Sequence, residues 1–266
     1  MLGIFENNKH PGEYRLHRKI LNGILRRSSD RIPVEDSYIE ALRYKYPKPY
    51  GALFHLYDAN LGNVCTATPI RSDVLLTAAH NYKNDIFGSD YEPVYRIVQG
   101  MHKKSNIVIE TLLDKKIHKK YSFNEGYNDQ YDLCLLFLAN KENGTSFKPY
   151  PSRNYLKNNL NVWTMGYPSK DSDRLYFGLG EALETVKNLI GYNAAATPGM
   201  SGGGLFCIIE NKLELIGMHV GDKFKAKNQF ENESFKAIFF TEEILNWIDT
   251  SIFEFNQIYN EQPSMV

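Results

Sequence analysis

Cysteine, net charge and long apolar runs are all scarce in this chain. Its 3 cysteines are too few and too scattered for a disulfide framework, and their apolar surroundings predict buried, reduced thiols. Lys and Arg number 31 against 31 for Asp and Glu, which leaves no net charge to attract nucleic acid or an anionic membrane surface. No segment approaches the roughly 20 apolar residues of a membrane span. We therefore expect neither nucleic acid nor a membrane span.

Metal and cofactor motifs are also missing. The 7 histidines show no paired spacing beside an acidic residue, and there is no paired-cysteine zinc motif. The glycines at 202–204 lack the lysine of a phosphate-binding loop. We therefore expect no metal and no cofactor. The apolar run near the start is too short for a secretory signal, which predicts a cytoplasmic protein, or one delivered into a host cell without a classical signal peptide.

The residues that are present predict an all-β body. With 42% hydrophobic and 13% aromatic residues, the chain can bury a large core. From Tyr50 onward, short strand-forming runs alternate with turn signals, as in a β-barrel or β-sandwich. A short strand is expected just before His80. The other expected strands cover residues 52–57, 64–70, 94–101, 107–117, 133–138, 161–166, 175–183, 185–192, 204–210, 212–220 and 237–241.

The first 45 residues differ from this body. Apolar residues within 14–25 recur at three- and four-residue spacing opposite a basic face, which predicts an amphipathic helix. Residues 1–45 are therefore interpreted as an N-terminal helical extension or pro-segment. It either packs on the body or acts as an inhibitory or substrate-engaging arm, since Arg26 and Arg27 suit an exposed cleavage site.

The remainder divides into two lobes and a final helix. A polar segment over 139–159 is typical of a crossover, so we expect a first lobe at 46–150 and a second at 151–266. A C-terminal helix is expected over 242–253, with Thr241 as its N-cap.

Ser201 stands among glycines just before an apolar run. A serine hydroxyl is a poor nucleophile at neutral pH, so it needs a base and a set of N–H groups to hold the oxyanion that forms. Neighbouring glycines allow a sharp turn that aims such groups at one point, and the expected donors are the N–H of Gly199 and of Ser201. A lone Ser-Gly-Gly more often marks a surface turn, so the interpretation depends on the rest of the chain.

A base and an orienting acid are both available. His80 follows a short apolar strand, and Asp132 stands at the head of the apolar run 133–138. A poorly solvated carboxylate needs a donor, which the N–H of a neutral imidazole supplies. The order His, Asp, Ser is one of the few known triad orders. We therefore interpret His80 as the general base, Asp132 as its orienting acid and Ser201 as the nucleophile.

Other titratable residues compete for these roles. Glu142, His102 and His118 stand in polar, loop-like contexts that provide no strand to hold them rigid. Asp129 is the more serious alternative for the acid, although it precedes the apolar run by several residues.

The segments that carry these residues resemble the motifs of trypsin/chymotrypsin-like serine peptidases. Residues 76–80 resemble the histidine motif of that family, 132–136 the aspartate motif and 198–203 the nucleophile motif. More narrowly, residues 215–221 resemble the glutamyl endopeptidase branch, which includes the V8-like proteases and exfoliative toxins. The resemblance implies two six-stranded antiparallel β-barrels of the chymotrypsin type, with the triad between them and a protein or peptide as substrate.

The resemblance also implies residues that bind the substrate. His219 matches the histidine that contacts an acidic side chain before the scissile bond in V8-like proteases, and Val220 and Gly221 would pair with the substrate backbone. Ala196 stands where those proteases use a threonine for the same carboxylate. The expected enzyme is a serine endopeptidase with a loose preference for an acidic residue at that position.

Two departures from the family pattern accompany the matches. Met200 replaces the usual Asn or Asp before the serine, and Asn81 follows His80 where much of the family has a cysteine, so Cys65 has no bridge partner there. The alternative function is a catalytically silent, trypsin-like peptide-binding module, a pseudoprotease. Retention of all three triad residues favours the enzyme, whose activity would be held in check by narrow specificity, a regulatory partner or the N-terminal segment.

Overall fold

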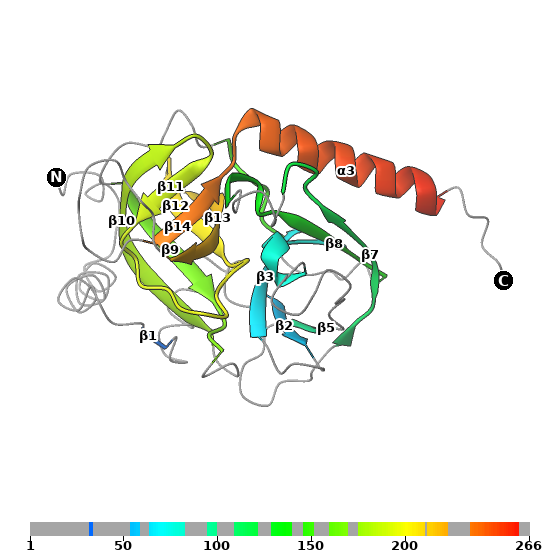
Figure 1. Ribbon diagram of the computed structural model, residues 1–266, viewed down its shortest axis with the longest axis horizontal. Helices are drawn as coiled ribbons and strands as arrows, with labels where there is room; N and C mark the ends of the chain where they lie inside the picture. Colours follow the sequence, from blue (N-terminus) through cyan, green and yellow to red (C-terminus); the bar gives the residue numbers. More distant parts are fainter. Residues whose placement is uncertain are drawn as a thin grey trace, which may run out of the picture.

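The computed structural model shows two β-lobes and a C-terminal helix (Figure 1). The expected N-terminal helix lies outside the residues that the structure describes, as do His102 and Glu142. The described residues are 32–33, 54–58, 64–82, 95–99, 109–121, 129–139, 146–151, 160–169, 175–210, 212–222 and 235–260.

The first lobe is a single antiparallel sheet that curls on itself. Its order is β6-β5-β2-β3-β4-β8-β7. The two end strands, β6 and β7, are separated in sequence only by Thr111, so one residue joins the two ends of the sheet and closes it. Two short 3₁₀ helices, η2 (Ala79–Asn81) and η4 (Asp129–Tyr131), precede or follow its strands. The strands are β2 (Phe54–Asp58), β3 (Val64–Arg71), β4 (Val74–Thr77), β5 (Tyr95–Gln99), β6 (Ile109–Glu110), β7 (Leu112–Ile117) and β8 (Cys134–Leu138).

The second lobe is a closed barrel with one added strand. Its order is β1-β10-β11-β14-β13-β12-β9, and β9 also pairs with β10, which closes the ring. The predicted pair of six-stranded antiparallel barrels is confirmed; each sheet counts seven strands because Thr111 divides one expected strand and β1 adds to the other. The strands are β1 (Ile32–Pro33), β9 (Asn161–Gly166), β10 (Tyr176–Val186), β11 (Leu189–Tyr192), β12 (Gly204–Ile209), β13 (Lys212–Asp222) and β14 (Phe235–Phe239).

Helix α3 (Glu242–Asn260) follows β14 and lies across the first lobe (Figure 1). It begins where the sequence predicts, and the Thr241 side chain accepts a hydrogen bond from the Ile244 N–H at 3.4 Å, which confirms Thr241 as the N-cap. It continues well beyond residue 253, because Phe255 stacks on Phe137 of β8 with ring centroids 4.1 Å apart. This tertiary contact stabilises turns that the local pattern does not indicate.

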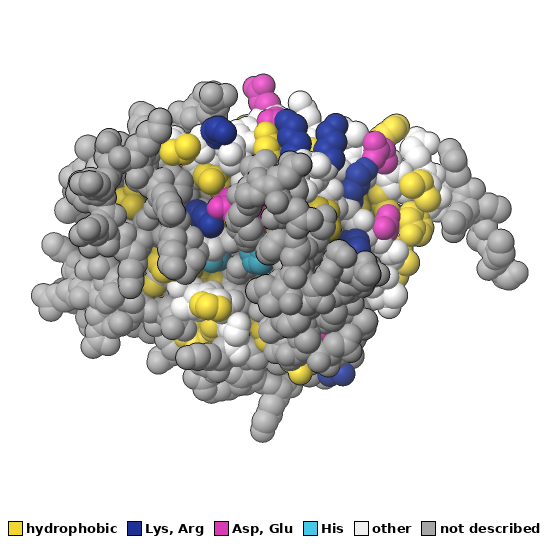
Figure 2. All heavy atoms as spheres, in the orientation of Figure 1, with side chains coloured by type: hydrophobic (Ala, Val, Ile, Leu, Met, Phe, Trp, Pro, Cys, Tyr) yellow, Lys and Arg dark blue, Asp and Glu magenta, His cyan; other side chains and the backbone are white. Residues whose placement is uncertain are grey.

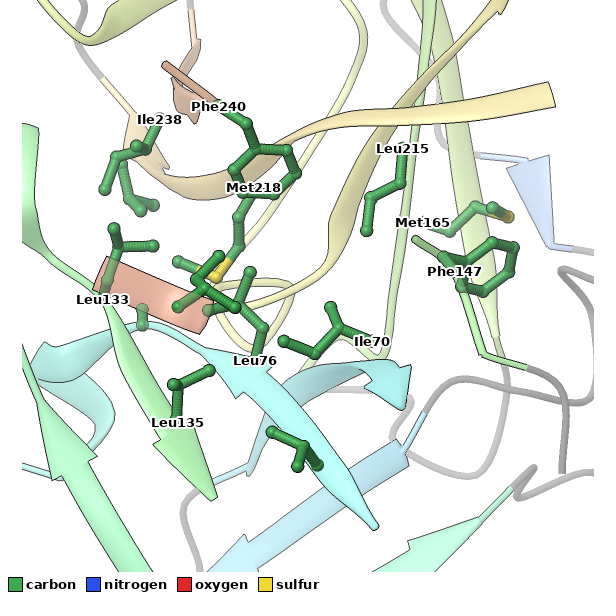
Figure 3. Close-up of a cluster of buried hydrophobic side chains, with 14 of the residues drawn as sticks. Ile70, Leu76, Leu133, Leu135, Phe147, Met165, Leu215, Met218, Ile238 and Phe240 are labelled. Carbon is green, nitrogen blue, oxygen red and sulfur yellow. The ribbon is translucent and has the colours of Figure 1, made fainter. Parts of the chain in front are cut away.

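One apolar core joins the two lobes. Leu76 and Leu135 of the first lobe face Met218 and Ile238 of the second within a single buried cluster (Figure 3). Each such side chain contributes about 1.5–3 kcal/mol when it is removed from water. The shared core therefore fixes the position of one lobe on the other, which any site at their boundary requires.

Candidate active site

His80 and Asp132 form a tightly bonded pair at the lobe boundary. β4 ends at Thr77, and η2 then turns His80 toward Asp132, which lies two residues before β8. The His80 N–H donates to Asp132 Oδ1 at 2.8 Å, and the ring nitrogen Nδ1 lies 2.6 Å from Asp132 Oδ2. Because a carboxylate accepts, the ring hydrogen is assigned to Nδ1, which leaves Nε2 as the basic nitrogen.

The environment of this pair favours a protonated His80. Burial lowers the pKa of His80, but the charge and hydrogen bond of Asp132 outweigh burial, and the net result is a pKa above the usual 6.5. Asp132 is 0% exposed, whereas the His80 side chain remains 22% exposed. Histidine side chains reach the surface near the middle of the face drawn in Figure 2. Asp132 thus holds His80 from the protein interior, while part of the His80 side chain remains accessible to solvent.

The segment that carries Ser201 is a tight double turn. The Met200 N–H donates to Thr197 O at 3.0 Å, and the Gly203 N–H donates to Met200 O at 2.9 Å. Gly199 and Gly202 have φ values of 96° and 90°, in the left-handed region that disfavours other residues. At Gly202 a side chain would also collide with the backbone oxygen of Thr66. The glycines predicted to shape this loop are required by its geometry.

Strand β3 and η2 of the first lobe hold the carbonyls of this loop. The hydrogen bonds run from Thr66 Oγ1 to Gly199 O at 2.9 Å, from Thr66 N to Ser201 O at 3.0 Å, from Asn81 Nδ2 to Ser201 O at 3.2 Å, and from Thr68 Oγ1 to Gly202 O at 3.0 Å. Neither threonine was expected from the sequence to have a role in the site. The available signal was a pair of threonines two residues apart within an apolar run, which places both on one face of a strand.

The orientation of the loop leaves two N–H groups for an anion. The Ser169 N–H donates to Pro198 O at 2.9 Å, and the N–H of a trans peptide points opposite to its carbonyl. The Gly199 N–H therefore points away from Ser169. Within the described residues, neither the Gly199 nor the Ser201 N–H donates a hydrogen bond, and none joins Ser201 Oγ to His80. Such catalytic hydrogen bonds often tighten only when substrate binds.

His219 lies directly beside the serine loop. The Gly202 N–H donates to His219 O at 2.9 Å, and the His219 N–H donates to Gly203 O at 2.8 Å. The residue is 2% exposed, and its Nδ1 lies 2.6 Å from the hydroxyl of Tyr192, a partner that no sequence pattern indicated. Burial, reinforced by His80, lowers the pKa of His219 to about 3, although a hydrogen bond to the backbone of Lys236 opposes this. The ring is therefore neutral near pH 7.

The remaining residues of the expected substrate site occupy the same strand and loop. Ala196 is buried just before the serine turn, and Gly221 lies beyond His219 with φ at 152°. Pairing of β13 with β14 is interrupted between His219 and Gly221. The Val220 side chain belongs to the apolar core between the lobes, so only the backbone of Val220 remains for the expected pairing with substrate.

The competing residues have other partners. Asp129 pairs with Lys236, whose Nζ lies 2.6 Å from Oδ2, and not with the His80 ring. His118 lies in a loop directly after β7, as expected, but its context is not polar: it is buried and stacks on Tyr131, with ring centroids 4.7 Å apart. Burial lowers the pKa of His118 to about 4, so it packs as a neutral ring.

Thiols and metal ligands follow a simple pattern. All three cysteines are buried and form no disulfide, as the sequence predicts. Within the ranges that the structure describes, no three side chains of His, Cys, Asp or Glu are grouped as metal ligands would be. In the same ranges, no helix combines the length and apolar character needed to cross a membrane.

Comparison with known proteins agrees with this geometry. The sequence matches the Trypsin family model over residues 43–248, which is most of the chain. The chain belongs to the trypsin family. The matched range of this trypsin-family member contains His80, Asp132, Ser201 and His219.

The fold of this trypsin-family chain is that of a solved Glu endopeptidase, determined in complex with MPD. The two structures share a TM-score of 0.64 at 16% sequence identity, and the match covers 84% of this chain and 96% of that chain. No curated protein matches the chain in sequence.

Proposed function

We propose that this protein is a serine endopeptidase, with His80 as general base, Asp132 as its orienting acid and Ser201 as nucleophile. The observation that carries the proposal is a chain of contacts across the lobe boundary. Asp132 holds His80 through two hydrogen bonds, and the next residue, Asn81, donates to the carbonyl of Ser201. The base and the nucleophile are therefore carried by adjoining backbone segments from different lobes.

The proposed reaction uses each group at a stated atom. Ser201 Oγ attacks the scissile carbonyl while His80 Nε2 takes its proton, and the N–H groups of Gly199 and Ser201 stabilise the oxyanion. The buried charge of Asp132 stabilises the imidazolium that forms, in keeping with the raised pKa of His80. His80 then gives the proton to the leaving amine, and water hydrolyses the acyl-enzyme by the same route.

The test of this mechanism is labelling by a fluorophosphonate probe, whose phosphorus is attacked by an activated serine with loss of fluoride. Wild type should be labelled, whereas Ser201→Ala and His80→Ala should not. Asp132→Asn should reduce turnover by roughly 10⁴, which is the loss that the corresponding change causes in serine proteases with this triad. Equal, background labelling of wild type and Ser201→Ala would refute the enzyme and favour a peptide-binding module.

We further propose a loose preference for an acidic residue before the scissile bond. His219 is neutral, so it would recognise a carboxylate through an N–H rather than through charge. The Tyr192 hydroxyl, whose pKa is raised by burial, remains protonated and can donate to Nδ1, which places the ring hydrogen on Nε2. A substrate carboxylate is a stronger acceptor than the Lys236 backbone and would take over or share that hydrogen.

Ala196 explains why the preference should be loose. It offers no hydroxyl to the carboxylate, and one missing hydrogen bond to a charged group is worth about 1.5–3 kcal/mol. The test is a peptide library in which His219→Ala flattens the acidic preference more than it slows cleavage of other peptides. Tyr192→Phe, which keeps the ring but removes the donor, should flatten it partially. A wild-type preference for Arg, Lys or large aromatic residues would refute this assignment.

A further inference from the structure

A partly buried ion pair bridges the two lobes beside the proposed triad. Lys236 Nζ of β14 lies 2.6 Å from Asp129 Oδ2 of η4, and the two side chains are only 14% and 18% exposed. Among the described residues, the other carboxylate oxygen of Asp129 is buried and has no hydrogen-bond partner. Breaking such a pair by removing one charge costs more than breaking an exposed pair, because the remaining charge stays partly shielded from water.

The Asp129 end of this pair is coupled to the acid of the triad. The Asp132 N–H donates to Asp129 O at 3.3 Å, so one short turn contains both carboxylates. Any displacement of Asp129 would tilt this turn. Because Asp132 holds the His80 ring and backbone, the tilt would be passed on to the proposed base.

The Lys236 end belongs to the strand that supports the expected substrate site. Lys236 is paired with Gly221, and a side-chain carbon added at Gly221 would lie 3.2 Å from Cε of Lys236. The absence of a side chain at Gly221 thus leaves room for the lysine to run along β13 toward the first lobe. The pair therefore joins the segment that carries the acid to β14, which is paired with the strand that carries His219.

Four charged or titratable groups surround His80. Asp132 and Asp129 raise its pKa, Lys236 lowers it, and His219 couples to it from β13. The two members of the ion pair thus act on the pKa of His80 in opposite directions, and their effects partly cancel.

We propose that Asp129 and Lys236 are positioning residues that lock the turn carrying Asp132 onto β14, the strand paired with the expected substrate strand β13, and so hold the His80–Asp132 dyad in place for Ser201. This inference rests on the proposed serine endopeptidase function and adds to it an ion pair between the lobes that neither lobe could form alone. The pair does not touch the reacting atoms. It acts through the position and the charge environment of His80.

The test compares three variants with wild type: Asp129→Asn, Lys236→Met and the double variant. Each single change removes one charge but keeps most of the side-chain volume. Each should lower kcat/KM about ten- to a hundredfold, the order produced by small displacements of catalytic groups. The double variant should lose no more than the worse single variant, because the two residues act as a unit.

A pH profile separates positioning from a merely structural role. Asp129→Asn removes a charge that raises the pKa of His80 and leaves Lys236 uncompensated, so the acid limb of kcat/KM should move to lower pH. NMR titration of the His80 ring should show the same downward shift without any turnover. Lys116→Met, which breaks an exposed ion pair with Glu254, is the matched control and should change neither quantity.

The outcomes distinguish the two proposals. An Asp129→Asn variant with unchanged His80 titration and kcat/KM within twofold of wild type would overturn the positioning pair while the endopeptidase stands. Loss of thermal stability in the single variants with no shift of the acid limb would also overturn it. Absence of Ser201-dependent labelling in wild type would overturn the endopeptidase and, with it, the catalytic role of the pair.

Discussion

Thr66 offers a sharp test of how the serine loop is held. Its hydroxyl donates to Gly199 O at 2.9 Å and accepts from the Tyr167 N–H at 2.8 Å, and the residue is fully buried. Thr66→Val keeps the shape of the side chain but removes both hydrogen bonds. Thr66→Ser is the matched control, because it keeps the hydroxyl and loses only a methyl group.

The expected cost of Thr66→Val follows from the two groups left without partners. A buried backbone carbonyl or N–H that loses its partner costs about 1–3 kcal/mol, so two of them lower the free energy of unfolding by about 2–4 kcal/mol after local relaxation. In a chain of this size, 3 kcal/mol corresponds to a fall in Tm of about 6–12 °C. The methyl group lost in Thr66→Ser costs only about 0.8 kcal/mol.

Catalysis should also suffer in Thr66→Val. Gly199 carries a proposed oxyanion donor, and loss of a complete donor of this kind lowers kcat by about 10²–10³. In Thr66→Val the donor is kept but is held less firmly, so the rate at which Ser201 reacts should fall by about tenfold. Denaturant unfolding and the rate of fluorophosphonate labelling measure the two effects. The reasoning would be refuted if the free energy of unfolding of Thr66→Val lay within about 0.5 kcal/mol of wild type. It would also be refuted if Thr66→Val were as stable and as quickly labelled as Thr66→Ser.

Three further predictions concern other parts of the site. Gly202→Ala should abolish labelling and destabilise the fold, because φ is 90° and the added carbon collides with Thr66 O; normal labelling would contradict the loop geometry. Activity needs neutral His80, whose pKa is raised, so kcat/KM should rise with pH through a midpoint above 6.5, and a lower midpoint would argue against the dyad. The contribution of charged His80 to folding stability depends on pH in the opposite way to activity. It is complete below the pKa that His80 has in the unfolded chain, and it is lost as the pH rises through its pKa in the folded protein. The three buried cysteines should resist a thiol reagent in the native protein and react fully on unfolding; fewer than three reactive thiols after unfolding would reveal a disulfide.

Much of the fold was predictable because its signals are local. The strand at 161–166 and the start of the last helix at Glu242 have the predicted bounds, since alternation and a capping threonine lie within a few residues of each other. His80 and Asp132 were recognisable for the same reason, because each adjoins an apolar strand. The end of the helix was missed because it depends on Phe137, more than a hundred residues away in sequence.

The sequence by itself determined which residues are proposed to carry the chemistry: a serine among glycines, a histidine after one strand and an acid before another. Only the tertiary structure decided their partners. Thr66 reaches the carbonyl of Gly199 across 133 positions, and Lys236 reaches Asp129 across 107. These contacts arise from the closure of two barrels and the packing of one lobe on the other. Neither contact is marked by a periodic pattern in the sequence. Local patterns encode backbone conformation, whereas the pairing of distant side chains is settled only when the sheets close and their shared core is buried.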